Sequence, residues 1–131
     1  MHPRLAAEWA DLLVAYPGVT HHEQPDRIET DLDLDANLFT PARTRVAVLI
    51  PPGYPTTGPD GFLVPAGLVM TGGLPASDAS GAGMAGWMLV SFHMFDGNGQ
   101  STWRPTADPR RGDNFVGYLC SIENFLARGC N

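Results

Sequence analysis

The sequence predicts a single α+β domain in which an N-terminal helix is followed by a four-stranded antiparallel meander and a C-terminal helix. Three observations lead to this prediction. Apolar residues recur at helical spacing over residues 3–16 and again over residues 113–128, while residues 27–35 alternate strictly between apolar and polar or charged side chains. We treat residues 1–131 as one domain, with a flexible glycine-rich loop at residues 65–86.

Residues 3–16 are predicted to form an amphipathic helix that packs one face on the core. Arg4, Glu8 and Asp11 are predicted to point away from that face. Pro3 suits a first-turn position, and Pro17-Gly18 ends the helix. The predicted buried face carries Leu5, Trp9, Leu12, Leu13 and Tyr16.

Strands are predicted at residues 27–35, 43–50 and 62–64, with a further short strand around residues 18–23. The first of these has one apolar and one mainly acidic face, whereas residues 43–50 are more continuously apolar and therefore more central. Turn-forming residues separate the runs, which predicts an antiparallel meander.

Residues 65–86 hold six glycines and no clear period, so we expect a long flexible loop with a functional role. Residues 87–95 are again extended and apolar, and Asp96-Gly97-Asn98-Gly99 predicts a turn.

The second helix is predicted at residues 113–128, with Asp113 as its N-cap and Gly129 after its end. Cys120 lies on this helix beside the apolar face, which predicts a buried structural thiol. With Cys130 it makes two cysteines, too few for a disulfide framework or a zinc site.

Composition excludes several classes of function. The net charge is −6 and the eight basic residues are all arginine, so no basic stripe is available for nucleic acid or a membrane surface. No apolar run is long enough to span a bilayer, and no signal peptide is apparent, so we expect a cytoplasmic protein. Neither a metal nor another cofactor is expected, because the histidines lack partners at ligand spacing and no phosphate-binding motif is present.

The segment Ile50-Pro51-Pro52-Gly53-Tyr54-Pro55-Thr56-Thr57-Gly58-Pro59 is predicted to be a stiff loop between two strands, because proline restricts φ and removes a backbone donor. The later triplet Trp103-Arg104-Pro105 precedes the second helix. Together with the element order, these two motifs resemble those of the ubiquitin-conjugating (E2/UBC) superfamily, whose Tyr-Pro-x-x-Pro-Pro segment has one more proline.

Within that superfamily the chain looks most like the prokaryotic E2 group called family E, on the progression Gly86-Trp87, Ser91-Phe92-His93 and Trp103 to Asp108. It departs from the superfamily at two points. The His-Pro-Asn triplet is missing, and the position of the catalytic cysteine is taken by Phe95, which cannot form a thioester.

The resemblance implies a non-standard E2-like component of a bacterial ubiquitin-like protein modification system that lacks the usual catalytic cysteine. Its implied partners are a ubiquitin-like protein and an E1-like enzyme. His93 is the candidate for any chemistry, as a proton shuttle, although a hydrogen-bonded structural histidine is the other interpretation. Trp103 and Asp108 would shape the site and Tyr54 would brace it, with Cys120 as a second candidate nucleophile.

Two alternatives remain open. In the first, the protein is a non-catalytic E2-variant binding module, in which the Tyr54 loop, the glycine-rich segment and Trp87 line a groove for a proline-rich or ubiquitin-like partner. In the second, it is an unrelated small α+β protein whose loop only imitates the motif.

Overall fold

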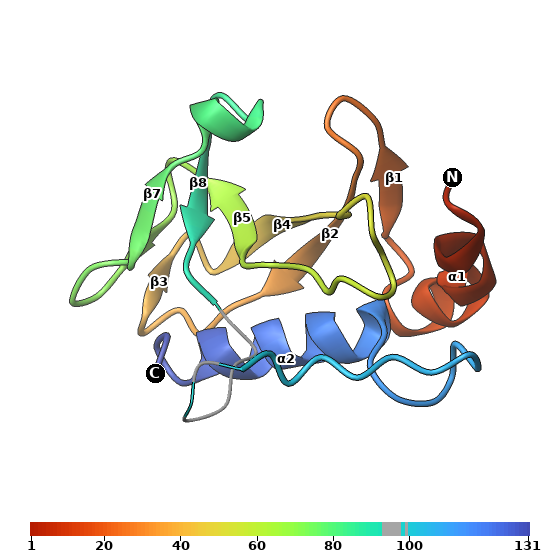
Figure 1. Cartoon of the computed structure of the whole chain (residues 1–131). Coiled ribbons are helices and arrows are strands. Elements are labelled where there is room, and N and C mark those ends of the chain that lie inside the picture. The colour runs from red at the N-terminus through yellow and green to blue at the C-terminus, as the bar shows by residue number, and fades with distance from the viewer. Residues whose placement is uncertain (93–97, 99) are drawn as a thin grey trace.

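The computed structural model describes residues 1–92, 98 and 100–131, and it has the predicted α+β class (Figure 1). Two helices of similar length lie at the two ends of the chain, and a six-stranded antiparallel sheet lies between them in sequence. The helices are α1 (Pro3–Ala15) and α2 (Phe115–Ala127), with a short 3₁₀ turn η1 (Ser80–Ala82). None of the helices in the described part of the chain is long and apolar enough to cross a membrane.

The main sheet has the strand order β1-β2-β4-β5-β8-β7. Its first four strands, β1, β2, β4 and β5, follow one another in the chain apart from the short β3, as the predicted meander requires. β2 pairs with β4 over its full length. A separate two-stranded ribbon joins β3 to β6. The strands are β1 (Thr20–His22), β2 (Arg27–Asp33), β3 (Phe39–Thr40), β4 (Arg43–Leu49), β5 (Phe62–Pro65), β6 (Val69–Met70), β7 (Ala76–Asp78) and β8 (Trp87–Val90).

Residues 65–86 are not the structureless loop that their glycine content suggested. They contain β6, β7 and η1, and β7 forms one edge of the main sheet. Strands of two or three residues are too short to produce a periodic pattern, which is why the sequence did not reveal them. Gly72 and Gly73 adopt positive φ between β6 and β7, so glycine there permits the reversal.

The main core lies between the sheet and α2, which runs across one face of the sheet (Figure 1). The apolar stripe predicted for α2 is buried there. Its buried residues are Phe115, Tyr118, Leu119, Ile122 and Leu126.

The opposite face of the sheet is divided between charges and apolar side chains. Toward β1, the buried carboxylate of Glu29 pairs with Arg27 at 2.7 Å and with Arg45 at 2.8 Å. Burial disfavours ionisation of Glu29, but the hydrogen bonds from Arg45 and Arg27 outweigh it and lower the pKa of Glu29. Toward β8, a smaller apolar cluster surrounds Ala47 and Leu63.

Three local predictions were wrong. Glu8 is 1% exposed although it was expected to point away from the core, whereas Leu13 is 41% exposed. The N-cap of α2 is Asn114, whose side chain accepts from the Gly117 N–H, and Asp113 instead accepts from the Arg104 N–H at 2.6 Å. Cys120 is an exposed residue rather than a buried one.

Candidate functional site

Glu8 connects three parts of the molecule that are distant in sequence. One carboxylate oxygen accepts hydrogen bonds from Arg4 Nε at 2.9 Å and from the Tyr54 hydroxyl at 2.5 Å. The other accepts from the Phe115 N–H at 2.7 Å, at the first residue of α2. A single buried carboxylate therefore joins α1, the proline loop and the start of α2, and each of its bonds is charge-assisted.

Tyr54 anchors the proline loop to the core. The side chain is 2% exposed and its ring lies 4.6 Å from Phe115 and 6.0 Å from Trp103, centroid to centroid. Burial, then the hydrogen bond to Glu8 and the Glu8 charge, raise the pKa of Tyr54, so its phenol stays a neutral donor. Tyr54 is therefore buried beneath the loop, and the bracing role predicted for it in a site stays a prediction.

Trp103 holds the other side of the same loop. Its indole N–H donates to the Pro55 carbonyl at 2.7 Å, and the indole packs directly on Gly58. A Cβ atom added at Gly58 would lie 2.5 Å from Trp103 Cδ2, closer than side-chain contacts allow. The loop therefore meets a tryptophan 48 residues further along the chain. At their contact only glycine fits without displacing the indole ring.

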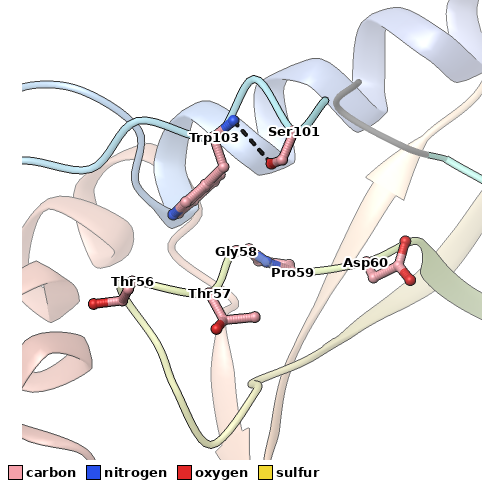
Figure 2. Close-up of a pocket in the computed structure, with 7 residues that line it drawn as sticks. All are labelled: Thr56, Thr57, Gly58, Pro59, Asp60, Ser101 and Trp103. Carbon is pink, nitrogen blue, oxygen red and sulfur yellow. Dashed lines mark hydrogen bonds between the residues drawn. The ribbon is translucent and has the colours of Figure 1, made fainter. Parts of the chain in front are cut away.

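A depression of about 360 Å³ lies where the loop meets Trp103. Figure 2 shows that its residues come from two segments, the loop after Tyr54 and the chain before α2. The four polar side chains among them are exposed, so the depression is open to solvent. It is lined by Thr56, Thr57, Gly58, Pro59, Asp60, Ser101 and Trp103.

A second depression, of about 570 Å³, shares the lining residues Thr57, Gly58 and Asp60 with the first. Its other walls are mostly apolar and consist of prolines and aliphatic side chains, apart from Asp26. We call the two depressions together the proline groove. The remaining residues of the second depression are Pro25, Asp26, Leu49, Ile50, Pro51 and Pro52.

Of the predicted site residues, Tyr54 and Trp103 are brought together and Asp108 is not. Asp108 closes a turn of its own, because its carboxylate accepts from the Arg110 N–H at 3.0 Å and lies 3.8 Å from Arg111 Nε. It lines neither depression of the groove.

Trp87 also lies apart from this geometry. Trp87 is on β8, half-buried against the smaller apolar cluster, and does not line the groove. His93 and Phe95 lie outside the described residues, so the predicted role of His93 stays a prediction.

Cys120 has polar surroundings. The Tyr16 hydroxyl donates to Glu123 at 2.5 Å and lies 3.2 Å from the Cys120 Sγ. Burial of the ring and the contacts with Cys120 and Glu123 raise the pKa of Tyr16. Cys120 does not line the groove. The residues of α2 that are buried in the core run from Phe115 to Leu126 and do not include it.

No metal centre is evident in the part of the chain that the structure describes, since no three histidine, cysteine or acidic side chains there are grouped as ligands.

Arg4 Nη2 is buried without a hydrogen-bond partner among the described residues, although its Nη1 donates to the Thr106 carbonyl. No described depression reaches this atom.

Comparison with known proteins identifies no relative: no protein-family model matches the chain, and no curated protein or solved structure matches it significantly.

Sequence analysis missed three residues of this region. Gly58 and Asp60 lie within or beside the Tyr-Pro motif, and the motif itself was the signal that could have pointed to them. Glu8 gave a signal of the opposite kind, because a glutamate among alanines on an amphipathic helix is typical of a solvated face.

Proposed function

We propose that this protein is an E2-like component of a ubiquitin-like protein modification system, and that it acts as a binding module for an extended segment of a protein partner. The observation that carries the proposal is the proline groove between the Tyr54 loop and Trp103. The ubiquitin-like partner and an E1-like enzyme remain the implied associates of such a component.

The order of elements supports the E2-like part of the proposal. α1 precedes a meander of β1, β2, β4 and β5, the Tyr-Pro loop joins β4 to β5, and Trp103 stands before α2. The loop and the tryptophan are also in direct contact through the Trp103–Pro55 hydrogen bond. The two motifs behind the resemblance are therefore parts of one local structure, which an accidental likeness in sequence does not require.

The chemistry of the groove supports binding over catalysis. Among its described lining residues there is neither a thiol nor an imidazole, and Cys120 lies elsewhere on α2. A thioester needs a thiolate, and acid–base catalysis needs a titratable group near neutral pH. Hydroxyls, prolines and an aromatic ring instead provide hydrogen bonds and apolar contacts.

The shape of the groove favours an extended chain as its occupant. Two depressions that share Thr57, Gly58 and Asp60 form a site of two parts rather than one enclosed cavity. Small-molecule sites bury most of their ligand. An extended peptide, by contrast, places successive side chains in successive shallow pockets while its backbone bonds to hydroxyls such as Thr56 and Ser101.

The test is selection from a phage-displayed library of random dodecapeptides on the immobilised full chain, followed by fluorescence anisotropy with the enriched peptides. Thr56→Tyr adds a ring in the groove, whereas Thr102→Tyr makes the same change at an exposed position outside both depressions. We expect Thr56→Tyr to weaken binding about tenfold and Thr102→Tyr to have little effect. Equal binding by both variants would disprove the groove as the binding site.

A second experiment tests the distinction from an enzyme. The chain is incubated with ATP and with the cognate E1-like enzyme and ubiquitin-like protein. We expect a non-covalent complex that Thr56→Tyr weakens. A covalent adduct that disappears in His93→Ala or Cys120→Ser would replace the binding module with a conjugating enzyme.

A further inference from the structure

We propose that a depression between the end of α1, β2 and α2 is a second binding site, which takes a primary ammonium group on a short aliphatic chain. The depression has a volume of about 420 Å³ and shares no lining residue with the proline groove. The site is therefore separate from the one in the proposed function and does not depend on it. We call it the Thr30 depression.

The first support is the hydroxyl of Thr30, a residue of β2 that lines this depression. Thr30 is 3% exposed, and its hydroxyl makes no hydrogen bond within the part of the chain that the structure describes. In that part, Arg4 Nη2 is the one fully enclosed side-chain nitrogen or oxygen without a partner, so the Thr30 oxygen is not fully enclosed. A buried hydroxyl that no internal group satisfies costs free energy until a ligand or water bonds to it. The depression is the open space from which a ligand can do so.

The second support is Glu123 on α2, which lines the same depression. Its Oε1 accepts from the Tyr16 hydroxyl at 2.5 Å, and no arginine or histidine pairs with it among the described residues. Burial above all raises the pKa of Tyr16, so the phenol stays neutral and leaves the charge of Glu123 uncompensated. The other carboxylate oxygen can accept from a ligand.

The remaining charges of the depression are paired with one another. Arg43 lies 2.6 Å from Asp33 and 3.8 Å from Asp31, and all three line the depression. Arg45 adds a second contact to Asp31 at 3.4 Å. The charge left without a partner is therefore that of Glu123, which favours a cationic ligand and disfavours an anionic one.

The walls suit an aliphatic amine better than a guanidinium. Ala15, Pro17 and Leu32 offer apolar surface for a short aliphatic chain, as such surfaces do for lysine stems. An ammonium group carries three donors on one compact centre, enough for Thr30, Glu123 and a water molecule. A planar guanidinium has five donors, more than the hydroxyl and the remaining carboxylate oxygen can accept.

The experiment is an NMR titration of the ¹⁵N-labelled full chain with n-butylammonium chloride, compared with n-butanol at constant ionic strength. We expect butylammonium to bind about fivefold more tightly than the neutral alcohol and to shift the amide signals of residues that line the depression. A parallel titration with N-acetyl-lysine methylamide distinguishes the source of the group. Binding as tight as that of butylammonium indicates a lysine side chain of another protein, and weaker binding indicates a free amine.

Two variants remove the two proposed contacts. Thr30→Val nearly keeps the shape of threonine, and because the hydroxyl has no partner within the described protein, stability should stay the same or rise. Glu123→Gln keeps an acceptor for Tyr16 and removes the charge. We expect each variant to weaken butylammonium binding about fivefold. The same spectra show whether each variant is folded.

Matched controls make the same two changes elsewhere. Thr44→Val removes a buried hydroxyl and Glu23→Gln an exposed carboxylate, and neither position lines a described depression. Both should bind butylammonium as wild type does. Equal affinity of wild type for butanol and butylammonium would overturn the inference without any variant. So would wild-type affinity in Thr30→Val or in Glu123→Gln, whereas none of these results bears on the proline groove.

Discussion

Replacement of Glu8 by alanine is expected to destabilise the protein more than any other acidic substitution that we propose. The change removes the acceptor for two buried donors, the Tyr54 hydroxyl and the Phe115 N–H, and for the Arg4 guanidinium. A buried donor left without a partner costs about 1–3 kcal/mol. Removing one member of a buried ion pair costs about 3–5 kcal/mol.

These costs overlap because the donors share one carboxylate, so we expect a loss of about 4 kcal/mol rather than their sum. Small domains have a total unfolding free energy of about 5–15 kcal/mol. The loss should therefore lower the urea midpoint by about 2 M at an ordinary denaturant dependence. Glu8→Gln keeps the volume and one acceptor oxygen, and we expect it to lose about half as much.

The assay is equilibrium unfolding in urea followed by tryptophan fluorescence, since Trp103 lies against the loop that Glu8 holds through Tyr54. Glu23→Ala is the matched control, because Glu23 is exposed and its side chain makes no described hydrogen bond. It should change the unfolding free energy by less than about 0.5 kcal/mol. A Glu8→Ala midpoint equal to that of Glu23→Ala would refute the view that this carboxylate joins the three elements.

Three further predictions concern other parts of the chain. Gly58→Ala should lower the unfolding free energy by about 1–3 kcal/mol through its clash with Trp103, whereas Gly67→Ala, with no atom within 4 Å of the added Cβ, should be neutral or slightly stabilising in the same urea assay. Because the folded state lowers the pKa of Glu29 below its ordinary 4.5, its stabilising effect is present above that value and is lost as pH falls through the lower folded pKa. Glu29→Gln should therefore flatten the acid side of the stability profile, and a profile as steep as that of wild type would contradict this. Cys120 should react quickly with a thiol reagent in the native protein and Cys130 slowly, because Cys130 is half-buried and burial raises its pKa; the comparison of Cys120→Ser with Cys130→Ser measures it.

The long elements of the fold could be predicted because their signals are local. Both helices and the strands β2 and β4 lie within one or two residues of their predicted bounds. In each of them the apolar residues follow a pattern that can be read from neighbouring positions in the sequence. The strands β6 and β7 were missed because pairing with distant partners, not periodicity, defines them.

The candidate site was predictable only in part. The motifs pointed to Tyr54 and Trp103, and the structure brings their rings to 6.0 Å. They also suggested Asp108 and Trp87. In the structure Asp108 accepts a hydrogen bond within a local turn, and Trp87 packs against a separate apolar cluster. Spacing along the chain orders such residues, but it does not say which of them face one another.

By itself, then, the sequence determined the α+β class, the element order and the stiffness of the loop from Ile50 to Pro59, because backbone restriction and hydrophobic period act over a few neighbouring residues. Only the tertiary structure decided that Glu8 is buried, that Gly58 lies against Trp103 and that Asp60 lines three depressions. Each of these depends on contacts between residues dozens of positions apart, and the free energy of such contacts is set by packing and desolvation that no local pattern records.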